Sequence, residues 1–326
     1  MTDIKKNDDE ILHIYTKKIP AIKSLVEALK EIFRDVNVKF SPEVEKIDEN
    51  GNIKTTGGMY ITALNSNSNI LVRLHLEANK FGYFNCVPNP DEQKNYIMLG
   101  VNMSNLFKLI KFLNNDDELY IIYNKNSLNQ LNLRYENKQK KRVSDYYLNL
   151  LDLKEENIVI GKQKFDFVIT MPSNDFHTLI KNMSIIAELV DIKFVSTNSS
   201  NYSLIFSCEG DFASQHSSFN TTSVINNQDD KQDVQNVINV FKCDDITGEK
   251  ENNIVQGVYE LKALSLFSRC SQMCPTIELY IRNDSPLVIK YRVADMGTVH
   301  LILSPINNNE SNGVFDGKTS SSDDDN

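Results

Sequence analysis

Apolar and polar positions alternate near the end of the chain, over residues 286–305. Every second residue is apolar from 287 to 291 and again from 299 to 303, and this period of two is typical of β-strands. Between them, Ala-Asp-Met-Gly at 294–297 suits a turn, so the pattern predicts a β-hairpin. Residues 307–326 are mainly Asn, Ser, Gly and Asp with almost nothing to bury, which predicts a disordered tail.

Four other segments have apolar residues spaced three or four apart, the pattern of a helix with one buried face. They are residues 21–33, 104–113, 173–183 and 260–267. Segments with the composition of strands lie between the helices, at residues 59–64, 70–76, 118–122, 131–135, 165–170, 202–207 and 278–281. The chain is therefore predicted to combine few helices with many strands.

The order of these elements repeats in the two halves of the chain. Each half has a helix, then a strand with the sequence Glu-Leu-Tyr-Ile at 118–121 or 278–281, then a further strand. Helices this few beside so many antiparallel strands have to lie on one face of the sheets. We predict an α+β fold with two topologically similar domains, each made of two helix-strand units.

The domain boundaries follow from shifts in composition. We predict a flexible N-terminal extension (1–12), an N-terminal domain (13–149), a connector (150–164), a C-terminal domain (165–306) with a surface loop inserted at 226–253, and the tail (307–326). The connector carries three apolar residues at 158–160, for which two interpretations stay open. They attach the connector to a domain surface, or they form part of a groove for a peptide.

Composition excludes several classes of protein. With 326 residues, 40% hydrophobic and 24% charged, the chain has ordinary globular values, and its apolar runs are shorter than the roughly 20 residues of a membrane helix. The polar start lacks the apolar core of a signal peptide, so secretion is not expected. Five scattered cysteines suit reduced thiols better than a disulfide framework. A net charge of −9 argues against a surface that binds nucleic acid everywhere, although a local basic face is compatible with it.

Catalytic and metal-binding motifs are hard to find in the sequence. There is no Gly-rich phosphate loop, no HExxH and no GxSxG, so we do not expect an enzyme. Cys270 and Cys274 could bind a metal together with His300, but zinc sites usually have two close ligand pairs and only one is present. Buried thiols are the favoured interpretation, and neither a metal nor a cofactor is expected.

Each predicted helix carries at least one cation on it or beside it. These are Lys23, Lys30, Lys108, Lys111, Lys181, Lys262 and Arg269. Amphipathic helices normally carry lysines on their solvated face, so this pattern alone has an ordinary explanation. Glu27 and Glu31 on the first helix dilute its positive charge further.

Six short motifs, in order, resemble the DNA sliding clamps of the proliferating cell nuclear antigen (PCNA) type. They are LVEALK at 25–30, LGVNM at 99–103, VSDY at 143–146, LDL at 151–153, VITMPS at 168–173 and ADMG at 294–297. The resemblance suggests a giant virus or a protist as the source. It implies the DNA-clamp fold, with three chains closed head to tail around duplex DNA and helices lining the hole. It also implies a processivity factor for DNA polymerase, placed on DNA by a clamp loader and serving as a docking platform for replication and repair proteins.

The resemblance also assigns residues to surfaces. The seven helix cations would line the hole and meet phosphates without reading bases. A groove for peptides of the PIP type, which carry a Gln and paired aromatic residues, would be formed by Leu64, Ile158, Ile160, Pro286, Ile302 and Pro305. The subunit interface would involve Val143, Asp145, Tyr146, Phe212 and Phe219, on an edge strand at 141–149 and near a strand at 212–219.

Three positions depart from the family pattern. Thr178 replaces a lining cation, Ile302 replaces a groove aromatic, and Gly161 replaces a common proline. Alternative assemblies are a subunit of a hetero-trimeric checkpoint-type clamp and a monomeric viral processivity factor. The resemblance places the protein in a nucleus or, for a virus, in a replication compartment of the host cell.

Overall fold

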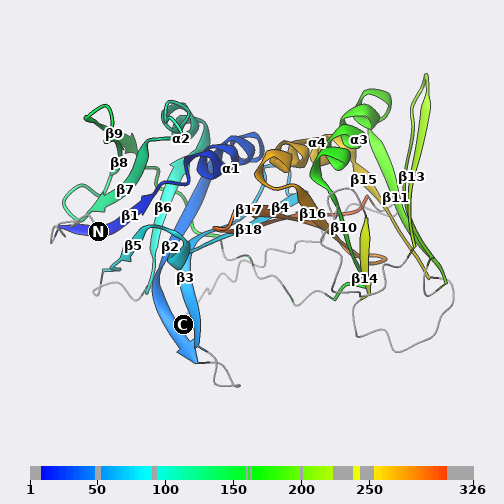
Figure 1. Cartoon of the computed structure of the whole chain (residues 1–326), viewed down its shortest axis with the longest axis horizontal. Helices are drawn as coiled ribbons and strands as arrows, with labels where there is room; N and C mark the ends of the chain where they lie inside the picture. Colours follow the sequence, from blue (N-terminus) through cyan, green and yellow to red (C-terminus); the bar gives the residue numbers. More distant parts are fainter. Residues whose placement is uncertain are drawn as a thin grey trace, which may run out of the picture.

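The computed structural model describes residues 9–47, 53–89, 94–156, 158, 161, 164–198, 201–222, 238–242 and 253–306. Within these residues the strands form three antiparallel sheets. Four α-helices lie together on one side of the sheets (Figure 1). The prediction of an α+β fold with helices on one face of antiparallel sheets is therefore confirmed.

A five-stranded sheet forms one end of the molecule. In spatial order its strands are β5 (Tyr83–Cys86), β1 (Glu10–Thr16), β7 (Glu118–Asn124), β8 (Gln130–Asn137) and β9 (Arg142–Asn149). A four-stranded sheet forms the other end, with the order β13 (Ser214–Thr222), β12 (Asn201–Glu209), β11 (Leu189–Asn198) and β15 (Asn253–Glu260). The edge strands β9 and β13 thus lie at opposite ends of the molecule (Figure 1).

A nine-stranded sheet runs through the middle and joins the two halves. Its order is β14 (Asn239–Lys242), β10 (Phe167–Pro172), β16 (Thr276–Ile281), β17 (Leu287–Val293), β18 (Gly297–Leu303), β4 (Ile70–Glu77), β3 (Ile53–Leu64), β2 (Asp35–Ile47) and β6 (Ile97–Asn102). The predicted hairpin is confirmed as β17 and β18. Because β18 also pairs with β4, the last strand of the chain connects the halves. A Cβ at Gly297 would lie 2.0 Å from the carbonyl oxygen of His75, so this close pairing requires a glycine.

The helices follow the predicted segments closely. They are α1 (Ile19–Ile32), α2 (Met103–Ile110), α3 (Ser173–Ile186) and α4 (Leu261–Ser268), with short 3₁₀ turns η1 (Ala78–Lys80) and η3 (Arg269–Met273). Helix α1 has a proline in its first turn, where the missing N–H costs nothing. Helix α2 is capped by Asn102, whose Oδ1 accepts a hydrogen bond of 2.9 Å from the backbone N–H of Asn105.

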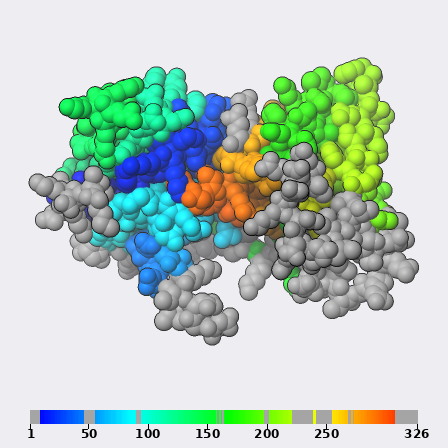
Figure 2. All heavy atoms as spheres, viewed as in Figure 1, coloured from blue at the N-terminus to red at the C-terminus, as the bar shows by residue number. Residues whose placement is uncertain are grey.

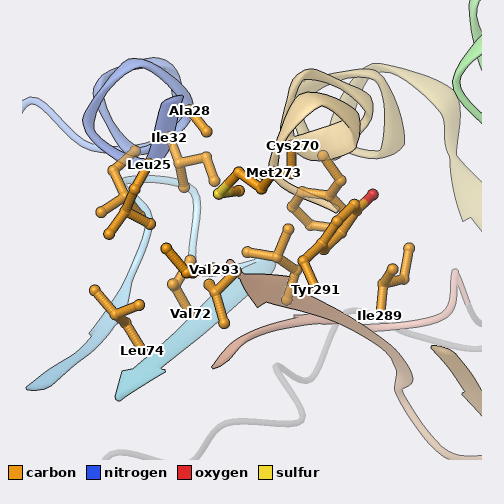
Figure 3. Packing of buried hydrophobic residues seen from close by; sticks show 14 of the residues in the cluster. Leu25, Ala28, Ile32, Val72, Leu74, Cys270, Met273, Ile289, Tyr291 and Val293 are labelled. Atoms are coloured by element: carbon orange, nitrogen blue, oxygen red, sulfur yellow. The ribbon is translucent and has the colours of Figure 1, made fainter. Parts of the chain in front are cut away.

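Buried side chains between the helices and the nine-stranded sheet form the core of the joint (Figure 3). Leu25 and Ile32 of α1 point toward Val72 of β4, while Tyr291 of β17 lies below Met273 of η3. In Figure 2 the orange atoms of the hairpin fill the space between the blue α1 and the gold α4. At the hairpin turn, the Asp295 carboxylate pairs with the Lys18 ammonium at 2.7 Å, just before α1. The two halves therefore share one continuous core.

Two segments differ from the predicted boundaries. Strand β1 begins at Glu10, inside the predicted N-terminal extension, because Leu12 and Ile14 are fully buried against the helices. Strand β14 lies within the predicted 226–253 loop and pairs with β10. Apart from residues 238–242 and 253, that loop lies outside the described residues, as does the predicted tail. Of the helices described, none is long and apolar enough to cross a membrane.

Candidate functional site

The four α-helices form one layer, in the order α2, α1, α4 and α3 across the molecule (Figure 1). Three lysines on three of these helices are exposed: Lys108 on α2, Lys181 on α3 and Lys262 on α4. Lys111, just after α2, is exposed too, and its ammonium lies 5.2 Å from the Phe112 ring centroid. Arg269 starts η3, but its side chain lies outside the described residues. The layer thus presents lysines in both halves of the chain.

The two lysines predicted on α1 are engaged within the protein. The Lys23 ammonium donates a hydrogen bond of 2.8 Å to the carbonyl oxygen of Leu113, after α2. The Lys30 ammonium pairs with the Glu31 carboxylate at 2.7 Å and lies 4.5 Å from the ring centroid of Phe107 on α2. Both lysines therefore hold α1 against α2, and they offer less free charge than the exposed lysines do.

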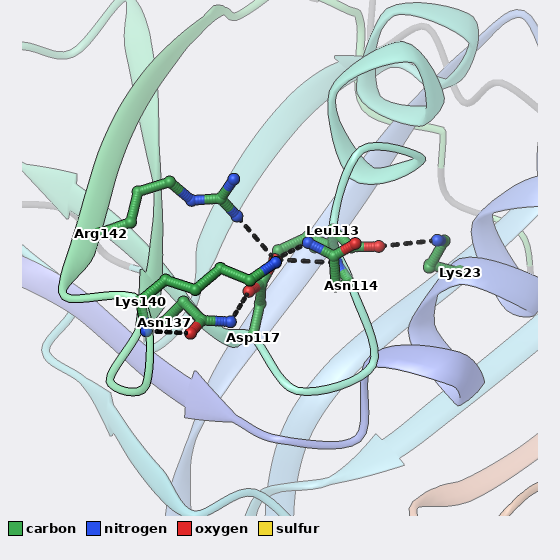
Figure 4. A network of polar contacts seen from close by, with 7 residues as sticks. All are labelled: Lys23, Leu113, Asn114, Asp117, Asn137, Lys140 and Arg142. Atoms are coloured by element: carbon green, nitrogen blue, oxygen red, sulfur yellow. Dashed lines mark hydrogen bonds and ion pairs between the residues drawn. The ribbon is translucent and has the colours of Figure 1, made fainter.

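A buried carboxylate fixes the loop that follows α2 (Figure 4). Asp117 is only 2% exposed and accepts hydrogen bonds from the backbone N–H of Asn114 (2.8 Å) and the side-chain amide of Asn137 (2.6 Å). The side-chain amide of Asn114 (3.1 Å) and Arg142, the first residue of β9 (3.2 Å), donate two more. Burial alone would raise the pKa of Asp117, but these donors together outweigh it and the pKa lies below its ordinary value. The network ties the end of α2 to the start of the edge strand.

The face of the nine-stranded sheet opposite the helices carries a row of apolar side chains, which we call the apolar row. It crosses five neighbouring strands through residues that face each other in register: Leu64, Leu71, Ile302, Val288 and Tyr280. Ile158 of the connector and Phe165 pack against the buried members of this row. The apolar row crosses the joint between the halves, and the connector lies beside it.

The structure brings together three of the six predicted groove residues: Leu64, Ile158 and Ile302. Pro286 is buried just before β17 and Pro305 is half-buried just after β18, so both flank the row without joining the cluster. Ile160 lies outside the described residues. Sequence reasoning missed Leu71, Val288, Tyr280 and Phe165. The available signal was the alternation in β16 and β17, where every second residue turns away from the helices.

Glu278 lies beside the apolar row and is held by several donors. Its carboxylate accepts a hydrogen bond from the Tyr280 hydroxyl at 2.6 Å and pairs with the Lys290 ammonium at 2.9 Å. Arg292 approaches to 3.7 Å. Burial would raise the pKa of Glu278, but these partners outweigh it, and the pKa is lowered.

This lowered pKa predicts a loss of stability in acid. The unfolded Glu278 would titrate near its usual value of about 4.3, so the stabilisation is complete above that pH and is lost as pH falls through the lower folded pKa. We expect Glu278→Gln to melt at a lower temperature than the wild type at pH 7, with the gap closing between about pH 5 and pH 3. Thermal unfolding at several pH values tests this. An unchanged gap across that range would show that the carboxylate is not held as described.

The two edge strands place the predicted interface residues differently. On β9, Val143 is 57% exposed, while Tyr146 is half-buried with its ring centroid 4.8 Å from that of Tyr135. Asp145 accepts a hydrogen bond of 2.9 Å from Arg134 on β8. Near β13, Phe212 is 73% exposed. Phe219 is half-buried, with its ring centroid 6.1 Å from that of Phe206. Each edge thus combines an exposed apolar residue with an aromatic ring packed on its own core.

Cys86, Cys208, Cys270 and Cys274, the cysteines that the structure describes, are buried, as the sequence predicted for Cys270 and Cys274. Burial raises the pKa of both thiols, so they remain protonated near neutral pH. In the part of the chain that the structure describes, no group of three or more His, Cys, Asp and Glu side chains could hold a metal ion.

Comparison with known proteins covers nearly the whole chain. Residues 12–157 match the family model of the PCNA N-terminal domain, and residues 159–306 match that of the C-terminal domain. The chain is 30% identical to a probable DNA polymerase sliding clamp of Acanthamoeba polyphaga mimivirus, over 93% of this chain and 64% of that protein, so it spans somewhat less than two thirds of that relative. It is also 30% identical to probable DNA polymerase sliding clamp 1 of Paramecium bursaria Chlorella virus 1, over 92% of this chain and 99% of that protein.

A solved structure supports the fold. The crystal structure of PCNA from Entamoeba histolytica superposes with a TM-score of 0.70 at 18% identity, covering 91% of this chain and all of that one. Both family models, the two viral relatives and this structure agree with the resemblance seen in the sequence. The chain belongs to the PCNA family.

Proposed function

We propose that the protein is a sliding clamp, a ring of three chains that encloses duplex DNA and tethers DNA polymerase to its template. The observation that carries this is the position of β9 and β13, two edge strands at opposite ends of one molecule whose helices share one side (Figure 1). Each of them pairs with a neighbour on one side only, among the residues that the structure describes. Head-to-tail pairing of such edges gives a closed ring when the rotation between copies closes. The names of the two viral relatives favour the same function.

The helix layer would then face the DNA. Exposed lysines contact phosphates through charge, which gives binding that depends on salt and ignores sequence, so a closed ring can move along the duplex. We propose Lys108, Lys111, Lys181 and Lys262 as the principal contacts, because these side chains are exposed. Lys23 and Lys30 would contribute mainly to the positive electrostatic potential of the helix layer, since each already has a partner within the protein.

The apolar row would bind peptides from replication and repair proteins. It is a narrow apolar strip on the face opposite the helices, with the connector beside it, and such strips accept apolar anchors of a short peptide. A ring built in this way needs no catalytic residue of its own, but it needs a loader that opens it on DNA. Its site of action would be the nucleus or a viral replication compartment.

Charge reversal on the helix layer tests this function. The double variant Lys108→Glu and Lys181→Glu should reduce clamp-dependent extension by the cognate polymerase on primed circular DNA by about tenfold or more near physiological salt, because repulsion replaces attraction to phosphates. Lys193→Glu is the control. The residues before and after Lys193 on β11 are buried in the core, so the Lys193 side chain points to the other face of the sheet, away from α3. If the double variant still forms the ring and extends DNA as well as Lys193→Glu, the helix layer does not face DNA.

A further inference from the structure

A second row of side chains runs along the apolar row on the same face of the nine-stranded sheet. Arg73 of β4 is directly opposite His300 of β18, and His300 is directly opposite Lys290 of β17. Each lies two residues from a member of the apolar row on its own strand, so it points to the same side. We call Arg73, His300 and Lys290 the basic row.

The basic row is an unfavourable arrangement in the free protein. Side chains directly opposite on antiparallel strands have Cβ atoms about 4.5–5.5 Å apart, and like charges there repel. Burial and the positive charges of Lys290 and Arg73 lower the pKa of His300, which keeps it neutral and limits this repulsion. The surplus of positive charge is notable in a chain with a net charge of −9.

In the part of the chain that the structure describes, carboxylates compensate the positive charge at only one end of the basic row. The Glu278 carboxylate forms an ion pair with Lys290 at 2.9 Å and a second, longer one with Arg292 at 3.7 Å. At the other end Arg73 is exposed, and among the described residues no carboxylate lies within ion-pair distance of it. One carboxylate, that of Glu278, thus faces three permanent cations, Lys290, Arg292 and Arg73. The excess of positive charge can be neutralised by an anion of a binding partner.

We propose that the basic row binds a carboxylate side chain of the partner peptide, next to the apolar residues that enter the groove. This inference rests on the proposed function of the apolar row. Two residues along a strand span about 6.6 Å, so an acidic residue one or two positions from an anchoring aromatic can reach the basic row from an extended peptide. Arg73 supplies the planar donor that suits a carboxylate, and Lys290 supplies a second charge. The row would select acidic partners among peptides with the same anchors.

Fluorescence polarisation with labelled peptides tests this selectivity on the full-length protein. The probes are one peptide with a Gln and paired aromatics, and versions with Glu or Gln at each of the two positions before and after the aromatic pair. At one or more positions the Glu peptide should bind about five- to tenfold tighter than its Gln counterpart, within the net contribution of an ordinary hydrogen bond. The preference should weaken as salt is raised.

Four variants assign the preference to the basic row. Arg73→Gln with Lys290→Gln should abolish it while leaving the affinity for the Gln peptides within about twofold, and Lys290→Arg should retain it. Glu278→Gln should enlarge the preference, because it removes the competing carboxylate. Lys193→Gln, on β11 of another sheet, is the matched control and should behave as the wild type.

The outcomes separate this inference from the proposed function. If the peptides bind but Glu and Gln versions bind equally at every position, the basic row has no role in recognition and the inference is wrong. If the preference survives in the double variant, another group recognises the carboxylate and the inference is equally wrong. If none of the peptides binds, the apolar row is not a partner groove, and the proposed docking function fails with it.

Discussion

Replacing Val143 by Glu and Phe212 by Asp in the same chain should convert the ring into monomers at micromolar concentration. Both side chains are largely exposed in the single chain, at 57% and 73%, so their substitution should leave the fold intact. In the proposed ring they would be buried between copies, where each apolar side chain contributes about 1.5–3 kcal/mol. Losing both, and burying two charges, should raise the dissociation constant about 100-fold or more. Light scattering coupled to gel filtration measures the mass.

The control for this experiment is Val44→Asp. Val44 is 47% exposed on β2 of the nine-stranded sheet, which contains neither β9 nor β13, and its replacement should leave the mass unchanged. A wild-type protein that stays monomeric at micromolar concentration would overturn the homotrimer and favour a monomeric processivity factor. A double variant that remains trimeric would place the interface elsewhere.

Replacing Asp117 by Ala should lower stability by about 3 kcal/mol. The substitution leaves the buried Asn137 amide without its acceptor, which costs more than the hydrogen bond itself contributes, and it also removes the ion pair with the half-exposed Arg142 guanidinium. The melting temperature should fall by about 6–12 °C if each kcal/mol shifts it by 2–4 °C. Since Arg142 begins β9, we also expect faster hydrogen exchange along that edge strand.

Asp116→Ala is the matched control, because the neighbouring carboxylate is exposed. Its effect should stay within about 0.5 kcal/mol, as for most surface substitutions. Thermal unfolding of both variants at pH 7 compares their melting temperatures and tests this prediction. Equal melting temperatures would mean that the buried carboxylate of Asp117 contributes little to holding the loop.

Local patterns predicted most of the fold. The apolar spacing of residues 21–33 and 173–183 was enough to locate α1 and α3, because a helix buries one face at a fixed period. The alternation at 287–303 located the hairpin in the same way, because a β-strand buries every second residue. Sequence did not reveal that β18 pairs with β4, because that contact joins residues more than 200 positions apart and depends on the arrangement of both halves.

The candidate surfaces were harder to predict at the level of single residues. The family resemblance assigned Lys23 to DNA, yet its ammonium donates a hydrogen bond to the carbonyl oxygen of Leu113, which lies 90 residues further along the chain. On β9 the family pattern pointed to Tyr146, which is half-buried, whereas its neighbour Tyr147 is 60% exposed. Neighbouring residues of a strand face opposite sides, and only the pairing register decides which side faces the core.

The pairing of β18 with β4 also bears on how the chain is made. During synthesis β3 and β4 leave the ribosome more than 200 residues before their partner β18. Until then β4 has an open edge with unpaired backbone groups and apolar side chains such as Leu74. Domains fold as they emerge, so the first half would wait with this edge exposed, and a chaperone or a β18 strand from another polysome could occupy it. Ribosomes stalled before residue 297 should therefore carry the chain in its most aggregation-prone state.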